Sequence, residues 1–395
     1  MCIRDRLQHR LGTSYQLKVS TSSKLEIISF YTDREFSNKL PFENGGQVNL
    51  KRSYWGIGAK YVTDNYLFTH PISSTIGADI SDQSDRRKRY NNIRGDRGSK
   101  VFDQLESFRN NAFYFQQSYL LYNKINIIWG SRWDNDKIES LDYYISDGLG
   151  SGFTSLNNTS PFAGLTYLFN KSMSIYTNYS NHYETPTLNE LSNDPDSLSV
   201  GGFNPKLNPQ ISNSLEIGSK GYVNNYFYYD VALFRSKIDN EITSFELEES
   251  PGKTFYRNIG ESQKEGIEIS LSSSIGNNIT LNLGYTYSNF EYANYVKNNK
   301  NLNGNRLPGI PQNTFNSDIY YINPNGYFII AGLTRYGIIY LNDLNDHEID
   351  PYSILNLRVG NEYKFFGSKL KVHIGANNLL NCLLYTSPSP RDLYT

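Results

Sequence analysis

The stretch Ile279–Tyr292, ITLNLGYTYSNFEY, alternates between apolar or aromatic residues and small or polar residues at almost every step. A repeat of two residues predicts a β-strand with one apolar and one polar face. The same pattern is typical of a soluble sandwich, where the apolar face packs on a second sheet, and of a membrane barrel, where it contacts lipid. The remainder of the chain has to distinguish the two.

The composition excludes several classes of protein. Of 395 residues, 38% are hydrophobic and 19% are charged, and no run of eighteen apolar residues occurs, so we expect no membrane-spanning helix. The net charge of -1 provides no general attraction for nucleic acid, which we do not expect as a partner. The 33 tyrosines and 21 phenylalanines suit strand surfaces and membrane interfaces.

Both ends of the chain carry unusual strings. The two cysteines, Cys2 and Cys382, lie in MCIRDR and CLLYTSPSPRD, which resemble translated sequencing adapters. We therefore expect residues 1–11 and 382–395 to be non-native, and the barrel sequence to occupy residues 12–381. Without these cysteines, the sequence predicts neither a disulfide framework nor a thiolate metal site.

The pattern of alternation predicts about sixteen strands, and the connections between them are of two kinds in strict succession. Short turns rich in Asn, Gly, Ser and Lys follow one end of each strand pair, and long polar segments follow the other. One trim end and one end with large loops is typical of an outer-membrane barrel. The predicted long connections are 37–46, 82–106, 139–159, 185–211, 246–253, 293–312 and 338–351.

The polar faces of the strands support the same interpretation. Near the C-terminus, Leu355, Leu357 and Val359 alternate with Asn356 and Arg358. Such a polar face inside a dry core would bury unpaired charge at a high free-energy cost, so it has to line a wet lumen. The predicted fold is all-β, a partial antiparallel up-and-down transmembrane β-barrel.

Two neighbouring strings, HYETPTLNEL (182–191) and FNPKLNPQISNSLEIGSK (203–220), resemble segments of the TonB-dependent outer-membrane receptors. Gln210 stands where that family more often has Glu. Further strings follow in family order, and the ordered set covers residues 12–381. These strings are SKIDNEI (236–242), YRNIGESQKEGIEISL (256–271), NRLPGIPQNTFNSDIYY (305–321) and GANNLLN (375–381).

The resemblance implies a transport receptor rather than an enzyme. Barrels of this family have about twenty-two strands, so about sixteen would be present here, without the N-terminal plug domain. The implied activity is import of a scarce small molecule, such as a ferric siderophore, across the outer membrane of a Gram-negative bacterium. The implied partners are the TonB complex, acting through the missing plug, and outer-membrane lipid and lipopolysaccharide; no resident cofactor is expected.

Two alternatives to siderophore import remain open at this point. The stretch 85–117 is similar to a subgroup linked to uptake of pyrroloquinoline quinone, so an importer of that cofactor is one alternative. A barrel enzyme or an adhesin in the same membrane is the alternative of another class. An enzyme would require a convergent acid–base set at the rim of the lumen, and an adhesin would not require a plug.

A basic run in the predicted loop 82–106 is the candidate ligand site. Arginine side chains bind carboxylates and phosphates through paired N–H donors, and an aromatic ring stacks on a planar ligand, so the run suits an anionic cargo. The competing interpretation is a solvated loop, or one that meets lipopolysaccharide phosphates. The five histidines lie far apart in the sequence, so no metal site is predicted. The candidate residues are Arg86, Arg87, Arg89, Tyr90, Arg94 and Arg97.

Overall fold

The computed structural model describes residues 4–148, 150–192, 194–196, 202–224, 226–247, 254–297 and 299–383. One antiparallel sheet of sixteen strands dominates them, as the sequence predicts, and each strand pairs with its neighbours in chain order. The strands are β1 (Arg4–Lys18), β2 (Ser23–Lys39), β3 (Gln47–Leu67), β4 (His70–Ile93), β5 (Asp96–Leu121), β6 (Ile125–Asp142), β7 (Gly152–Leu168), β8 (Met173–Glu184), β9 (Gln210–Asn224), β10 (Phe227–Asp239), β13 (Glu261–Ile275), β14 (Ile279–Asn294), β17 (Asn313–Ile322), β18 (Tyr327–Tyr336), β21 (Tyr352–Phe365) and β22 (Ser368–Ala376).

The connections hold short elements that the sequence did not predict. None of the helices in the described ranges is long and apolar enough to cross a membrane. Each small sheet has two strands and belongs to a single connection. These elements are η1 (Ile145–Asp147), α1 (Leu188–Leu191), β11 (Ile242–Glu246), β12 (Thr254–Asn258), β15 (Val296–Lys297), β16 (Lys300–Asn301), β19 (Ile339–Tyr340) and β20 (Glu348–Ile349).

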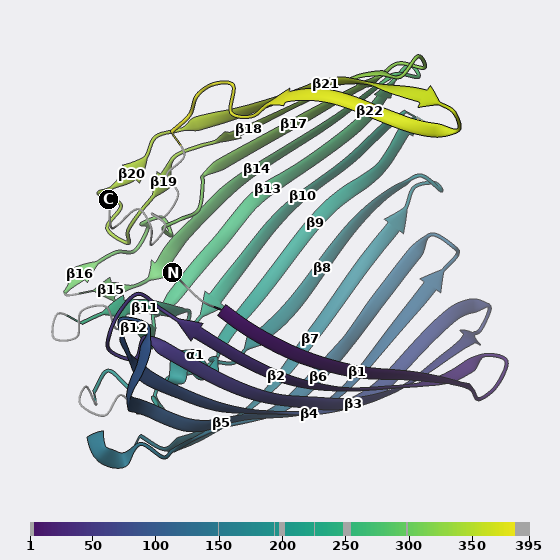
Figure 1. Ribbon diagram of the computed structural model, residues 1–395. Helices are drawn as coiled ribbons and strands as arrows, with labels where there is room; N and C mark the ends of the chain where they lie inside the picture. Colours follow the sequence, from purple (N-terminus) through teal and green to yellow (C-terminus); the bar gives the residue numbers. More distant parts are fainter. Residues whose placement is uncertain are drawn as a thin grey trace.

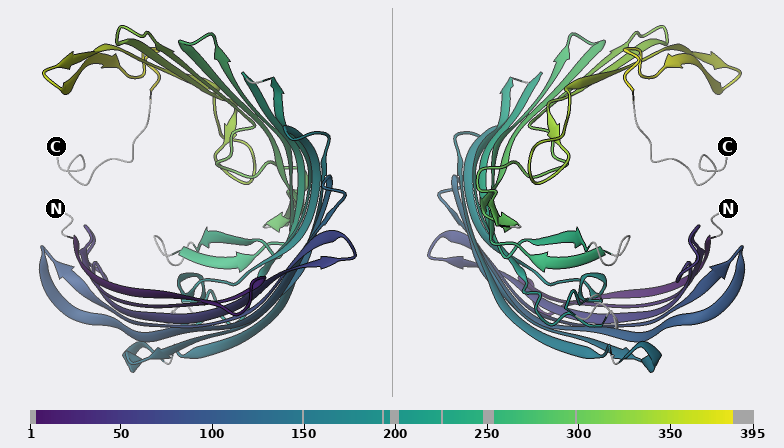
Figure 2. Two further views of the ribbon diagram at one scale, coloured as in Figure 1. Left: turned by 90° about the vertical axis from the view of Figure 1, so that its right-hand side faces the viewer. Right: turned by 90° about the vertical axis from the view of Figure 1, so that its left-hand side faces the viewer.

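The large sheet curls into the wall of an incomplete barrel (Figures 1 and 2). Strands β1 and β22 are the first and last of the sheet and face each other across a gap. The small sheets β11–β12 and β19–β20 lie on the concave side of the wall (Figure 2). The prediction of a partial up-and-down barrel is therefore confirmed.

The two ends of the wall differ as predicted, because tight turns lie at one end and the long connections at the other (Figure 1). Two predicted loops, 82–106 and 139–159, are wrong in extent. Strands β4 and β5 continue through the first of them, and β6 and β7 shorten the second to the segment between Asp142 and Gly152. Residues 248–253, most of the predicted connection 246–253, lie outside the described residues.

The β4–β5 hairpin shows why a polar composition misled the sequence interpretation. Its turn is Arg94–Gly95, both with positive φ (52° and 101°), as in two-residue hairpin turns. Ladder pairs continue from Ile93↔Asp96 down to Ile72↔Tyr119. Beyond the apolar band neither face of a hairpin needs apolar residues, since ion pairs and stacked rings across the strands replace them.

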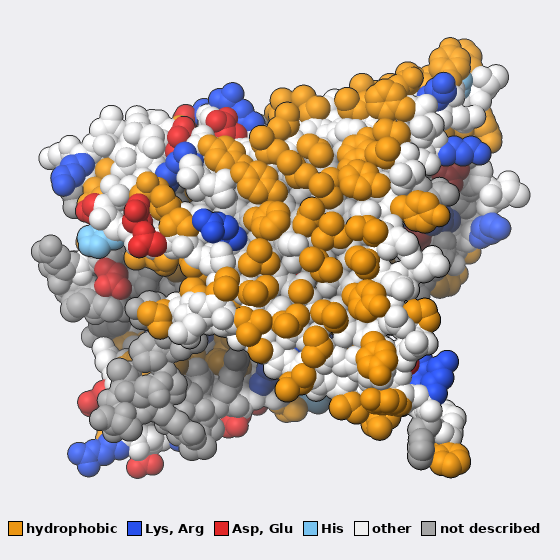
Figure 3. Space-filling view, turned by 90° about the horizontal axis from the view of Figure 1, so that it is seen from above, with side chains coloured by type: hydrophobic (Ala, Val, Ile, Leu, Met, Phe, Trp, Pro, Cys, Tyr) orange, Lys and Arg blue, Asp and Glu red, His pale blue; other side chains and the backbone are white. Residues whose placement is uncertain are grey.

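Apolar side chains gather on the convex face of the wall. In β14, Leu281 stands opposite Ile319, which is 43% exposed, and Val372 on β22 is 53% exposed. Figure 3 shows hydrophobic side chains as a broad band over the face of the wall that is seen from above. Within the described ranges a single layer forms this wall, so the two-sheet sandwich is excluded. The apolar face is the outer one, as the sequence predicts for a barrel.

Aromatic side chains surround the trim end of the wall. Tyr66, Phe68, Tyr122, Tyr226 and Phe366 lie at or beside four of its tight turns and are 63% to 94% exposed. Amphipathic or apolar rings at the edge of an apolar band are characteristic of interfacial girdles in membrane barrels.

Part of the predicted non-native leader belongs to the sheet. Residues 4–11 pair with residues 31–38 of β2. Pairing does not reveal the origin of a segment, so the interpretation of residues 1–11 and 382–395 as non-native stays a prediction. Residues 384–395 lie outside the described residues.

Candidate functional site

The six predicted ligand residues all belong to the β4–β5 hairpin, but they do not form one cluster. Ile76 and Ile80, 47% and 45% exposed, mark the convex face of β4. Since successive side chains point to opposite faces, Arg87 and Arg89 belong to the concave face and Arg86 to the convex face. The strand geometry therefore divides the predicted site.

Contacts agree with this division. Arg86 forms an ion pair with Asp103 at 2.7 Å and its guanidinium lies 4.0 Å from the ring centre of Tyr143. At the tip of the hairpin, the guanidinium of Arg97 lies 4.6 Å from the ring centre of Tyr90. Arg94 occupies the exposed turn. The other four predicted ligand residues, Arg86, Tyr90, Arg94 and Arg97, are thus separate from Arg87 and Arg89.

Instead, the concave face gathers arginines from three adjacent strands. Arg34 of β2 stands opposite Arg52 of β3, and Arg52 stands opposite Asp85 of β4, two positions before Arg87 on the same face. Arg89 follows two positions further toward the rim. We call Arg34, Arg52, Arg87 and Arg89 the arginine patch.

Two carboxylates partly compensate the arginine patch. Asp85, 3% exposed, accepts two hydrogen bonds from Arg52, from Nε at 2.8 Å and from Nη2 at 2.6 Å. Glu106, 4% exposed, forms an ion pair with Arg87. Each of these carboxylates has one arginine as its ion-pair partner, Arg52 for Asp85 and Arg87 for Glu106.

Arg89 is the least compensated member of the patch. Its Nε atom is buried and has no hydrogen-bond partner among the described residues. Its guanidinium lies 5.7 Å from the ring centre of Phe102, which also lies 5.0 Å from that of Arg87. A cation held over an aromatic face keeps its N–H donors available for other groups.

Burial affects the titration of the patch, which lies nearer the rim than the apolar band. Burial lowers the pKa of Arg89, and the charge of Arg87 lowers it further. Burial also raises the pKa of Glu106, an effect that exceeds the opposing influence of Arg87. Both directions follow from burial, and the low exposure of Asp85 and Glu106 indicates that this face holds charge in a weakly solvated environment.

Sequence reasoning missed Arg34 and Arg52 because they lie outside the basic run. Position 34 is 53 residues from position 87 in the chain, and only the strand register brings the two onto one surface. The available signal was alternation itself. Applied across β2, β3 and β4, it would have separated lumen-facing arginines from outward-facing ones.

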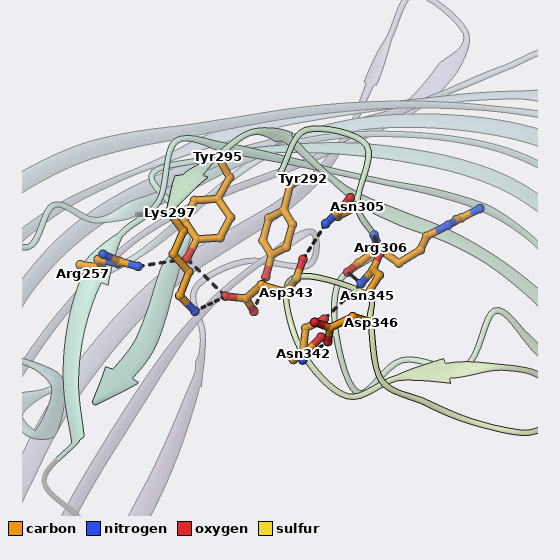
Figure 4. A network of polar contacts seen from close by, with 10 residues as sticks. All are labelled: Arg257, Tyr292, Tyr295, Lys297, Asn305, Arg306, Asn342, Asp343, Asn345 and Asp346. Carbon is orange, nitrogen blue, oxygen red and sulfur yellow. Dashed lines mark hydrogen bonds and ion pairs between the residues drawn. The ribbon is translucent and has the colours of Figure 1, made fainter. Parts of the chain in front are cut away.

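A second polar cluster lies across the rim, where three long connections meet around Asp343 (Figure 4). Its carboxylate accepts hydrogen bonds from the hydroxyls of Tyr292 at 3.1 Å and Tyr295 at 3.3 Å, and from Lys297 Nζ at 2.7 Å. Arg257 of β12 donates to the Tyr295 hydroxyl at 3.1 Å. We call these five residues the Asp343 network.

Neighbouring groups extend the Asp343 network into a compact unit. Asn305 donates to the backbone carbonyl of Asp343 at 2.8 Å, and Asn345 accepts from the backbone N–H of Arg306 at 2.6 Å (Figure 4). Beneath the polar groups lies a buried apolar cluster of Ile259, Tyr292, Tyr295, Leu302 and Leu307. The connections on this side of the rim therefore have a small core of their own.

The β8–β9 connection also packs against the wall. Leu191, Phe203 and Leu207 form a buried cluster with Ile138 of β6. Thr187 and Glu190 begin α1 with reciprocal side-chain to backbone hydrogen bonds, a capping box. Further hydrogen bonds join this connection to β12. Asn204 donates to the carbonyl of Tyr256 at 3.4 Å. The side chain of Asn258 accepts from the backbone N–H of Asn208 at 2.8 Å and donates to the backbone carbonyl of the same residue at 2.9 Å.

Metal ligation has no candidate in the described part of the chain, where no group of three or more His, Cys, Asp or Glu side chains is arranged to hold an ion. The carboxylates at the rim serve arginine, tyrosine and lysine partners instead. The surface is thus suited to binding by hydrogen bonds and charge.

Two curated relatives resemble stretches of this chain. One is the "Probable TonB-dependent siderophore receptor PiuA" of Acinetobacter baumannii, 28% identical over 195 residues, which cover 46% of this chain and 25% of the relative. Another is the "Ferrioxamine B receptor" of Salmonella typhimurium, 26% identical over 274 residues, covering 67% and 36%. The chain thus spans between a quarter and just over a third of the length of these relatives.

Solved structures share the fold at low identity. The unliganded ferric citrate transporter FecA superposes with a TM-score of 0.79 at 17% identity, covering 96% of this chain and 57% of that chain. The siderophore receptor PiuA of Acinetobacter baumannii gives 0.74 at 16% identity, covering 96% and 61%. The family model for the TonB dependent receptor-like β-barrel matches residues 3–379. The chain therefore belongs to the TonB-dependent receptor β-barrel family.

Proposed function

We propose that this chain is the wall of an outer-membrane receptor that imports a ferric siderophore. The observation that carries the proposal is the pairing of a family match over residues 3–379 with an inverted barrel wall, apolar outside and charged inside. Lipid would cover the convex face, and the lumen would be aqueous. The two curated relatives, both named as receptors for siderophores, support this cargo class.

Active import needs an energy source outside this wall. In the family this chain belongs to, a plug domain occupies the lumen and the TonB complex pulls on it. We propose the same partners here, together with outer-membrane lipid around the band and lipopolysaccharide beside the outward-facing charges of the β4–β5 hairpin. The Gram-negative outer membrane is the corresponding location.

The cargo contacts are part of the proposal. Arg87 and Arg89 would contact the ligand from the lumen wall, and Tyr90, Arg94 and Arg97 from the exposed tip of the hairpin. Arg86, the sixth predicted residue, is engaged by Asp103 and Tyr143 on the opposite face, so its contribution would be to hold the hairpin.

The alternatives receive less support. Neither of the two curated relatives is named for a quinone, so pyrroloquinoline quinone import rests on sequence similarity alone, in 85–117, ETPTLNEL (184–191) and NGNRLPGIP (303–311). A transport receptor is proposed in preference to an enzyme because the described relatives are receptors and transporters. An adhesin would leave the charged lumen wall without a role.

The test compares cells with and without the complete gene. We expect uptake of radioactive iron supplied as siderophore complexes, and growth on limiting iron, to depend on the gene and on TonB. If iron uptake is unchanged but growth on an external quinone cofactor requires the gene, the siderophore assignment is wrong and the cofactor alternative replaces it.

A further inference from the structure

We infer that the arginine patch selects anionic iron chelates that carry carboxylate or similar oxyanion groups, and that it discriminates against cationic chelates. The inference rests on the proposed import function and specifies the class of its cargo. The patch differs from the predicted run of six residues, because it joins Arg87 and Arg89 to Arg34 and Arg52 of neighbouring strands.

The carboxylates of the patch are already engaged by other donors than Arg89. Asp85 is engaged by both donors of Arg52 and by Gln83 Nε2 at 3.2 Å, and Glu106 is engaged by Arg87. Among the described residues neither carboxylate forms a hydrogen bond or ion pair with Arg89, on which the charge of Glu106 acts only from a longer distance. An incompletely paired charge in a weakly solvated site is unfavourable until an opposite charge arrives.

The ring of Phe102 fixes the positions of two of the arginines. Phe102 lies under the guanidinium groups of both Arg87 and Arg89, at 5.0 Å and 5.7 Å from its ring centre. The ring holds the two cations side by side without using their N–H donors, and the Nε atoms of both are buried and without hydrogen-bond partners. Paired N–H donors in a fixed plane match the two oxygens of a carboxylate.

The place of the arginine patch in the barrel also suits a ligand site. The patch faces the lumen, nearer the rim than the apolar band, where a chelate entering from outside would meet it. Outward-facing cations of the same strands are engaged differently: Arg109, for example, is 59% exposed at its side chain and binds Asp82 at 2.8 Å. Selection by charge therefore falls to the concave face.

The experiment measures import in cells that express the complete gene. The probes are ferric citrate and a ferric tricatecholate, both anionic, and ferrioxamine B, which is cationic. We expect at least one anionic chelate to be imported, and ferrioxamine B to be imported poorly. Arg89→Gln should weaken binding of the imported chelate by about ten-fold, since a hydrogen bond between charged groups is lost.

Two further variants keep the result interpretable. Arg89→Lys retains the charge without the paired donors and should recover part of the affinity. Arg109→Gln, on the opposite face of the same hairpin, should leave import and the surface abundance of the receptor unchanged. Surface abundance of every variant is measured by antibody labelling, so that a folding defect is distinguished from a binding defect.

The outcomes separate the inference from the proposed function. Import of ferrioxamine B in preference to both anionic chelates, or equal import by Arg89→Gln at equal surface abundance, would overturn the inference and leave siderophore import intact. If the gene confers import of none of the three chelates, the inference is overturned. The proposed function is overturned as well when iron uptake from every siderophore complex supplied is independent of the gene.

Discussion

The arginine patch and the Asp343 network are two charged regions at the rim, and they differ in how completely their charged groups are paired. In the Asp343 network, the carboxylate has a tyrosine, a second tyrosine and a lysine as donors. In the arginine patch, Asp85 pairs with Arg52 and Glu106 with Arg87, whereas Arg89 has no ion pair among the described residues. The comparison teaches that satisfied charge holds connections together, whereas unsatisfied charge suits a ligand.

The Asp343 network and the arginine patch also differ in the structure that surrounds them. Tyr292 and Tyr295, 3% and 4% exposed, belong to an apolar cluster that joins the end of β14 to segments of two connections, β10–β13 and β14–β17. The arginine patch lies on three adjacent strands, β2 to β4, whose ladder pairing determines the shape of its surface. We therefore expect the Asp343 network to govern the order of the connections, and the patch to govern recognition.

The largest effect on stability should come from Arg52→Ala. This change removes the two Arg52 donors from Asp85, which stays buried with Gln83 as its one remaining side-chain donor in the described part of the chain. Breaking a buried pair on one side costs about 3 kcal/mol. The midpoint of urea unfolding in detergent, followed by heat-modifiable mobility on gels, measures the loss. If Arg52→Ala lowered the free energy of unfolding by no more than the loss of an exposed ion pair does, burial of Asp85 would not strengthen this pair.

Asp343→Ala should follow, because three donors lose their acceptor at once. We expect a loss of about 2 kcal/mol, confined to the connections. Hydrogen exchange should accelerate in residues 292–306 and 254–258 while the β4–β5 hairpin keeps its protection. Asp350→Ala, an exposed aspartate of the same connection, is the matched control. Uniform acceleration across the sheet would show that the network is not a separate unit.

Alkaline pH should loosen the same region by a smaller amount. Burial, then Asp343, raises the pKa of Tyr292, so the folded state keeps this hydroxyl protonated more strongly than the unfolded chain does. The contribution is complete below the unfolded value of about 10 and is lost as pH rises above it. Tyr292→Phe should cost about 1 kcal/mol at neutral pH and flatten the alkaline slope measured by hydrogen exchange. An unchanged slope would assign the titration to another group.

The smallest effect should come from Arg109→Gln, since the Arg109–Asp82 pair is exposed to water. Surface pairs contribute little because solvent screens them, so the free energy of unfolding should change by about 0.5 kcal/mol or less. Measured beside Arg52→Ala, it isolates the effect of burial from that of charge. A loss equal to that of Arg52→Ala would remove the distinction between the two faces of the hairpin.

Sequence reasoning predicted the sheet better than the rim. Alternation in stretches such as Ile279–Tyr292 identified the strands, and the succession of short and long connections identified a meander with unequal ends. The predicted loop 82–106 was wrong because polar residues were taken as a sign of irregular backbone. Paired strands outside a membrane are free to be polar on both faces, so composition does not mark where they end.

The sequence alone determined the local rules of this protein: strand period, the side of each strand that is apolar, and tight turns between them, all of which depend on neighbouring residues. The tertiary structure decided which distant residues meet. Arg34, Arg52, Arg87 and Arg89 share one surface only through strand register, and Asp343 reaches Tyr292 only because the β18–β21 connection folds back over the end of β14. Such contacts depend on the closing curvature of the whole sheet, which no short stretch encodes.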